Sequence, residues 1–197
     1  MLTRTHDFPA PRRLTAALVA ALPLCLLGHV SASQAALVIS QVYGGGGNAG
    51  ATYKNDFVEL LNNGSAAVSA GGWSVQYASA TGSTWQVTQL PAGLLVQPGQ
   101  YVLVQMAAGT GGTTALAPDV LGTIAMSGTS GKVALVASTT ALTGATPAGL
   151  IDVVSYGSST PIEGTPTPVL SNTTAALRAD GGCADTNNNV ADFVVGS

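Results

Sequence analysis

Residues 56–90 read Asp-Phe-Val-Glu-Leu-Leu-Asn-Asn-Gly-Ser-Ala-Ala-Val-Ser-Ala-Gly-Gly-Trp-Ser-Val-Gln-Tyr-Ala-Ser-Ala-Thr-Gly-Ser-Thr-Trp-Gln-Val-Thr-Gln-Leu, and this stretch decides the fold of the chain. Within it, Trp73, Val75 and Tyr77 alternate with Ser74 and Gln76. An alternation of period two is typical of a β-strand, because successive side chains point to opposite faces. It predicts a strand with one face in a hydrophobic core and the other in water, between turns rich in Asn, Gly and Ser.

The rest of the chain extends this pattern. In the next run, Trp85 and Val87 alternate with Thr84, Gln86 and Thr88. No segment beyond residue 35 has a sustained helical period, and turn residues separate about nine short strands, which favours an all-β sandwich. Nine strands are expected at 36–43, 56–62, 73–78, 84–90, 101–106, 132–137, 151–156, 173–178 and 192–195, with a weaker one at 120–124.

Residues 1–35 have the three parts of a secretory signal peptide. A basic opening with three arginines precedes an uncharged apolar run at 14–27, and Ser33-Gln34-Ala35 supplies small residues at the −3 and −1 positions of a cleavage site. The run contains a proline and is shorter than the about 20 residues of a membrane span. We therefore expect a signal peptide at 1–35, one domain at 36–197, and a secreted or periplasmic protein. An uncleaved membrane anchor is the alternative.

Removal of the signal peptide leaves an acidic chain without histidine. Both histidines and Cys25 lie within residues 1–35, so we expect Cys183 to be alone in the exported form and the fold to depend on burial and strand pairing. The remaining cations are Lys54, Lys132 and Arg178, and the anions are Asp56, Glu59, Asp119, Asp152, Glu163, Asp180, Asp185 and Asp192. Three positive against eight negative charges argue against direct nucleic-acid binding, which depends on neutralising phosphates.

The order of motifs along the chain is similar to that of the bacterial lamin-tail domain. The pieces that carry this resemblance are Val-Ile-Ser-Gln-Val-Tyr-Gly-Gly-Gly-Gly (38–47), Tyr-Lys-Asn-Asp-Phe-Val-Glu-Leu (53–60), Gly-Trp-Ser-Val-Gln-Tyr-Ala-Ser (72–79), Gly-Lys-Val-Ala-Leu-Val (131–136), Asn-Thr-Thr-Ala-Ala-Leu-Arg (172–178), Asp-Thr-Asn-Asn-Asn (185–189) and Asp-Phe (192–193).

The resemblance covers essentially all of residues 36–197 and implies an immunoglobulin-like β-sandwich. It also implies an accessory module, because in bacteria such domains often precede the catalytic domain of secreted nucleases and other phosphoesterases. The family has no catalytic residues to carry over. The sequence departs from that context at Gly196-Ser197, where a linker to an enzyme domain is expected, so a fragment and a stand-alone module both remain open.

A glycine-rich segment after the first strand has the spacing Gly45-x-Gly47-x-x-Gly50 of a dinucleotide-binding loop. Such a loop holds phosphate by opening a helix. Here it runs on into another strand, at Asp56, so we expect a flexible loop at one end of the sandwich and no cofactor. Asp56 and Glu59 are three apart in that strand and face opposite sides, which excludes a shared catalytic role. We expect Glu59 to bond a backbone amide or Lys54 at the sheet edge.

Residues 185–189 offer oxygen ligands at positions 1, 3 and 5 of a possible calcium loop. Val190 stands at the sixth position, where that loop needs glycine, and Gly196 at the twelfth, where it needs glutamate. Asp180 and Asp192 are further possible ligands. The favoured interpretation is an Asx-type turn, in which these side chains bond the local backbone. We assign no metal site here, and calcium remains the alternative.

Cys183 has three possible roles: a disulfide to a cysteine beyond Ser197, an intermolecular disulfide, or a small buried hydrophobe. A nucleophilic role needs a base such as histidine, which residues 36–197 lack. Neither a catalytic triad nor a two-metal cluster is evident. We therefore expect no enzyme activity and no cofactor. The prediction is an exported accessory or interaction module, partnered by a protein or enzyme domain, with a stand-alone structural or adhesion protein of the envelope or extracellular matrix as the alternative.

Overall fold

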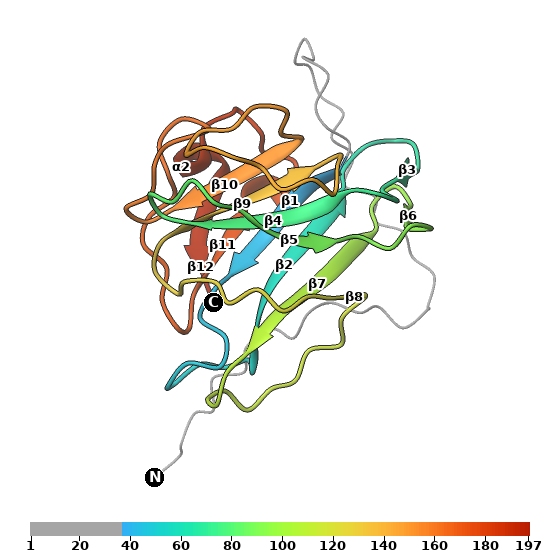
Figure 1. The fold of residues 1–197 in the computed structure, drawn as a ribbon. Helices are drawn as coiled ribbons and strands as arrows, with labels where there is room; N and C mark the ends of the chain where they lie inside the picture. Colours follow the sequence, from blue (N-terminus) through green and yellow to red (C-terminus); the bar gives the residue numbers. More distant parts are fainter. Residues whose placement is uncertain (1–36) are drawn as a thin grey trace.

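Two β-sheets packed face to face form the structure, a computed structural model in which residues 37–197 are described (Figure 1). The larger sheet has the strand order β12 (Phe193–Gly196), β11 (Ala175–Arg178), β1 (Leu37–Tyr43), β2 (Asn55–Asn62), β7 (Tyr101–Ala108) and β8 (Val120–Leu121). The smaller has the order β10 (Asp152–Tyr156), β9 (Gly131–Val136), β4 (Ser74–Ser79) and β5 (Gln86–Gln89). All neighbours are antiparallel except β7 and β8.

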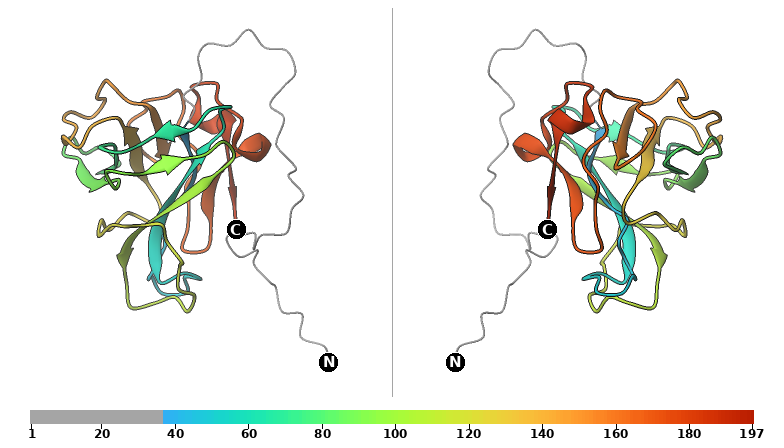
Figure 2. Two further views of the ribbon diagram at one scale, coloured as in Figure 1. Left: turned by 90° about the vertical axis from the view of Figure 1, so that its right-hand side faces the viewer. Right: turned by 90° about the vertical axis from the view of Figure 1, so that its left-hand side faces the viewer.

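Two kinds of minor element complete the described part of the chain. A two-stranded ribbon pairs β3 (Val68–Ser69) with β6 (Leu95–Val96). The short helical turns α1 (Ala179–Gly182) and α2 (Asn189–Asp192) flank the loop before β12, beside the edge of the larger sheet (Figure 2). α1 is interrupted by left-handed backbone at Asp180 and Gly181. No described helix is long and apolar enough to cross a membrane.

The predicted immunoglobulin-like β-sandwich is confirmed, and each expected strand has an observed counterpart. The prediction missed β3 and β6, because two-residue strands are too short to show an alternation. The signal-peptide prediction at 1–35 lies outside the described residues.

The main core lies between the two sheets. Val75 and Tyr77 face it from β4, as predicted, and Val58 and Leu60 face it from β2. Trp73 packs against the same core, but it is only partly buried, because it lies just before β4 at the end of the sandwich.

The outer face of the smaller sheet is not in water, which corrects the sequence interpretation. Ser74 and Gln76 are fully buried, because residues 137–150 fold back over them. The Gln76 side chain donates to Thr140 O at 2.9 Å and accepts from Leu142 N at 2.8 Å. Backbone partners supplied by this covering segment thus take the place of water.

The face assigned to Trp85 also needs correction. Val75 pairs with Thr88 and Tyr77 with Gln86, so Thr88 and Gln86 lie on the core side of β5. Trp85 is buried, but in a second hydrophobic cluster on the outer face of the smaller sheet. The alternation in β5 is as expected, but Trp85 lies on the face opposite to the one that the pattern of Trp73 and Val75 suggested.

A β-bulge interrupts the pairing of β1 with β2 close to the candidate site. Leu60 pairs with Ile39 and Glu59 pairs with Gln41, so Ser40 is an extra residue opposite β2. β11 pairs with β1 only at Gln41 and Val42. The backbone of Ile39 therefore lies beyond the end of the β1–β11 ladder and needs other hydrogen-bond partners.

Candidate functional site

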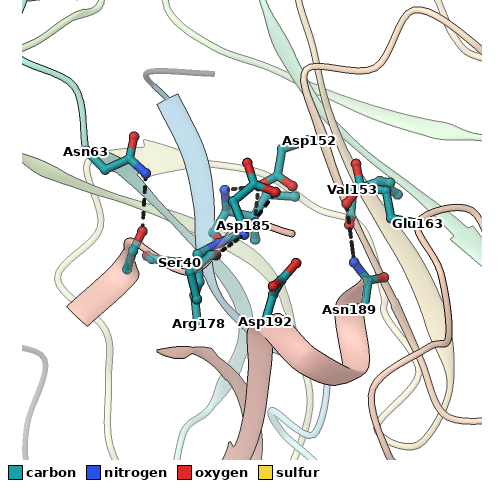
Figure 3. A network of polar contacts seen from close by, with 12 residues as sticks. Ser40, Asn63, Asp152, Val153, Glu163, Arg178, Asp185, Asn189 and Asp192 are labelled. Carbon is teal, nitrogen blue, oxygen red and sulfur yellow. Dashed lines mark hydrogen bonds and ion pairs between the residues drawn. The ribbon is translucent and has the colours of Figure 1, made fainter. Parts of the chain in front are cut away.

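A buried ion pair joins the two sheets at this place (Figure 3). Arg178 Nη2, from β11, donates to Asp152 Oδ2, from β10, at 2.5 Å. Their side chains are only 1% and 3% exposed. Asp152 and Arg178 begin and end their strands, so each reaches across the sandwich from a strand terminus.

The same two side chains supply the partners that Ile39 lacks. Ile39 N donates to Asp152 Oδ2 at 2.6 Å, and Arg178 Nε donates to Ile39 O at 2.8 Å. An aspartate and an arginine thus replace the missing strand neighbour of β1. Burial raises the pKa of Asp152, whereas the Arg178 guanidinium and the Ile39 amide oppose that rise.

Arg178 also organises the segment that follows β11. Its Nη1 donates to Ala184 O at 2.8 Å and lies 4.0 Å from Asp185 Oδ1. The guanidinium carbon lies 4.5 Å from the centre of the Phe193 ring, a cation–π contact with β12. One arginine therefore contacts β1, β10, β12 and the loop after α1.

Cys183, next to Ala184, is disulfide-bonded. The expectation of a lone Cys183 concerns the exported chain without residues 1–35, so it stays a prediction. Cys25, the other cysteine of the full chain, lies outside the described residues.

Asn189 protects the outer edge of β10. Its Oδ1 accepts from Ser155 N at 2.6 Å, and its Nδ2 donates to Val153 O at 2.9 Å. The side-chain amide thus pairs with β10 as a peptide group of a neighbouring strand would. Asn189 is fully buried. Figure 3 shows its contact with Val153, with Glu163 nearby.

Glu163 is held against this asparagine, with Asn189 Nδ2 at 3.3 Å from its Oε2. Burial raises the pKa of Glu163 to about 7. The negative charges of Asp152 and Asp185 add to this rise, and Arg178 opposes it.

Among the possible calcium ligands, Asp192 bonds the local backbone, as the favoured interpretation predicted, whereas Asn189 bonds β10 and Asp185 lies near Arg178. Both oxygens of Asp192 accept from Thr186 N at 2.9 Å, and Asn188 N donates to Asp192 Oδ2 at 3.2 Å. Asn188 Oδ1 in turn accepts from Thr165 N at 2.9 Å. Within residues 37–197, no three His, Cys, Asp or Glu side chains gather in a way that could hold a metal ion.

Asp56 lies at the other end of the sandwich. Its two oxygens accept from Gly46 N and Met126 N, each at 2.8 Å. Burial raises the pKa of Asp56 to about 6, and the two amide hydrogen bonds oppose the rise. The carboxylate thereby ties the glycine-rich segment to the strand that follows it.

The glycine-rich segment is packed, which differs from the expected flexible loop. Gly45 and Gly47 are buried, and Gly47 N donates to Tyr53 O at 2.9 Å. Gly47 has a φ of +69°, and a Cβ there would lie 2.1 Å from Gly109 N. Glycine is therefore needed because two backbone segments meet here.

Glu59 has a different partner from those expected. Ser40 Oγ, at the bulge, donates to Glu59 Oε1 at 2.8 Å. Asp56 bonds amides on the inner side of the larger sheet, whereas Glu59 bonds Ser40 on the outer side. The prediction that these two carboxylates do not share a site is therefore confirmed.

Lys132 is a buried cation that the sequence analysis left unplaced. It is 0% exposed and donates to Gly82 O at 2.8 Å and Ala145 O at 2.9 Å. Its Nζ lies 5.3 Å from the centre of the Trp85 ring. Burial lowers the pKa of Lys132. Lysine thus fastens the covering segment to the smaller sheet.

These side chains share a structural use: the buried charged groups bond main-chain atoms of neighbouring segments. Sequence reasoning missed the Asp152–Arg178 pair, although a signal was present. The strands at 151–156 and 173–178 are otherwise uncharged, and opposite charges inside buried strands need each other.

Comparison with known proteins agrees with this geometry. The family model of the lamin tail domain matches residues 30–186. Among solved structures, a DUF4876 family protein from Bacteroides thetaiotaomicron is similar, with a TM-score of 0.56 and 13% sequence identity. The match covers 81% of this chain and 70% of that chain, and at this identity it concerns the fold alone. No curated protein matches the chain.

Proposed function

The chain belongs to the lamin tail domain family, and on that premise we propose that it is an exported, non-catalytic accessory or interaction module that works beside a secreted nuclease or another phosphoesterase. The family membership supports the role of a module. The basic, apolar and small-residue order of residues 1–35 supports export.

One observation carries the part of the proposal in which the chain itself does not hold the nucleic acid, namely the placement of its cations. Of the three cations within residues 37–197, Lys132 and Arg178 are buried, so only Lys54 is exposed. A protein that binds the nucleic-acid backbone needs several exposed cations to displace counterions. One exposed lysine on an acidic domain supplies too little attraction, so an attached or separate enzyme has to hold the nucleic acid.

The placement of the carboxylates supports the non-catalytic part of the proposal. Asp152, Asp56 and Asp192 each accept at least two hydrogen bonds, in every case including main-chain amides of the domain. Metal-assisted phosphodiester hydrolysis needs carboxylates that converge on one ion and leave a coordination position open. Here the buried carboxylates are spread over both ends of the sandwich, and their lone pairs are engaged in holding the fold.

DNA binding tests the proposal at the level of the isolated protein. Fluorescence anisotropy of a labelled duplex should stay flat with the purified chain at low salt. A binding curve that weakens steeply with added salt would contradict the account, because it would reveal phosphate contacts.

Cross-linking in the producing cells tests the partnership. We expect mass spectrometry of chain-linked species from the periplasm and culture medium to contain a nuclease or phosphoesterase. Cross-links solely to envelope glycan or structural proteins would instead favour a structural or adhesion protein.

A further inference from the structure

We propose that removal of residues 1–35 has to precede folding, because the Asp152–Arg178 ion pair closes over the start of β1. A chain that folds first keeps its apolar leader, whereas a chain that is cut first is released without it. The proposed export, on which this order rests, places the cut bond after Ala35. β1 begins at Leu37, the second residue after that bond.

β2 fixes the start of β1 from one side. Leu37 pairs with Asn62, and Val38 pairs with Leu61. Leu37, Val38 and Ile39 are at most 1% exposed, and Leu37 and Ile39 belong to the main core between the sheets. Presenting these residues to a protease therefore breaks strand pairing and takes apolar side chains out of the core.

The ion pair fixes the same strand from the other side, where β11 does not reach. β11 pairs with β1 only at Gln41 and Val42. Ile39 is the fourth residue after the cut bond, and its N donates to Asp152 Oδ2 at 2.6 Å. Its O accepts from Arg178 Nε at 2.8 Å, and both hydrogen bonds are buried. β1 is thereby held on both sides close to the bond.

The partners of Ile39 come late in the chain. Asp152 follows it by 113 residues and Arg178 by 139. A chain that crosses a membrane from its N-terminal end presents the cut bond to a signal peptidase long before these partners arrive. The bond is therefore open to the enzyme during export and becomes closed when β10 and β11 join the fold.

Proteolysis of a folded chain proceeds through its transiently opened state, so the cutting rate reports how often β1 opens. A purified bacterial signal peptidase, added to the folded full chain in a non-ionic detergent, tests the order. Reducing conditions keep a disulfide at Cys183 from holding the products together.

The matched control carries about eight Gly and Ser residues inserted after Ala36, which leave residues 33–36 intact and move the bond from β1 by up to roughly 25 Å. The folded wild type should be cut at least roughly a hundredfold more slowly than this folded spacer variant.

A second comparison isolates the ion pair. At the wild-type spacing, Asp152→Asn should raise the cutting rate roughly tenfold or more, because it weakens the hold on Ile39. Trp85→Ala is the control, since Trp85 lies in the cluster on the outer face of the smaller sheet, and it should raise the rate less. Thermal melting shows which variants are folded at the assay temperature. The comparison of the wild type with the spacer variant needs neither substitution.

Rapid cutting of the folded wild type would overturn the proposal, as would a folded spacer variant that resists as strongly as the wild type. Equal rises in Asp152→Asn and Trp85→Ala would show that global unfolding opens the bond, and would overturn the part given to the ion pair. Intact mass of the exported protein separates these failures from a failure of the proposed export. A first residue at Ala36 leaves export and cleavage standing, whereas retention of residues 1–35 removes the premise.

Discussion

Replacing Asp152 by asparagine removes a charge from the centre of the ion-pair network while keeping the shape of the side chain. Asp152 Oδ2 accepts from both Arg178 Nη2 and Ile39 N, and both charged side chains are almost fully buried. The asparagine retains one oxygen acceptor but leaves the guanidinium without its counter-charge. Breaking a buried pair in this way typically costs about 3–5 kcal/mol. Since small domains are stable by about 5–15 kcal/mol, the effect should be large.

Urea unfolding followed by tryptophan fluorescence measures this cost. Asp180→Asn is the matched control, because Asp180 is exposed and asparagine tolerates its left-handed backbone. It should change the free energy of unfolding by less than about 0.5 kcal/mol.

A double-mutant cycle separates the pair from its surroundings. Arg178→Met alone should cost less at acid pH than at neutral pH, because a buried Asp152 without its partner can take up a proton. In the Asp152→Asn, Arg178→Met double mutant, the cost should be below the sum of the single costs by about 1–3 kcal/mol. A loss of less than about 1 kcal/mol for Asp152→Asn, or additive single costs, would refute the reasoning.

The two tryptophans should differ in the same urea assay: Trp85→Ala should cost about 3–5 kcal/mol and Trp73→Ala roughly half as much, because only Trp85 is fully enclosed. The reverse order would contradict the packing. Asn189→Ala should cost about 2–4 kcal/mol by leaving Ser155 N and Val153 O without partners, and an unchanged urea midpoint would show that water replaces the amide. The raised pKa of Glu163 contributes stability that is present below its ordinary value of 4.5 and is lost as pH rises through about 7. The free energy of unfolding should therefore fall less between about pH 5 and about pH 8 in Glu163→Gln than in the wild type. An equal fall in both proteins would contradict the raised pKa of Glu163. Intact mass of the exported protein should place its first residue at Ala36, and retention of residues 1–35 would disprove cleavage.

The period-two pattern was enough to predict the fold, but not which face each strand buries. Alternation at 73–77 identifies the core face of β4 correctly, because Val75 and Tyr77 are long apolar side chains facing the other sheet. It cannot tell that Ser74 and Gln76 are also buried, since the cover comes from residues 137–150, more than sixty positions away. Trp85 was assigned to the wrong side for the same reason.

Polar partners were predicted only where they are close in the sequence. The turn around Asp192 could be predicted, because its hydrogen bonds span four to six residues. Asp152 and Arg178 are 26 residues apart, and Ile39 is 113 residues from Asp152. Such contacts depend on the strand order and on the bulge at Ser40, which no local pattern shows. Charges in otherwise apolar strands were the available signal.

The central claim is that the buried carboxylates and cations of this domain hold the sandwich together, and that the chain, as we propose, does not itself cleave phosphodiesters. Incubation of supercoiled plasmid with the purified full chain, in Mg²⁺, Mn²⁺ or Ca²⁺, tests it most directly. The account predicts that the plasmid stays supercoiled with every ion. Metal-dependent nicking that co-purifies with the chain, and that disappears in an Asp185→Asn variant of unchanged stability, would contradict it and identify the chain as an enzyme.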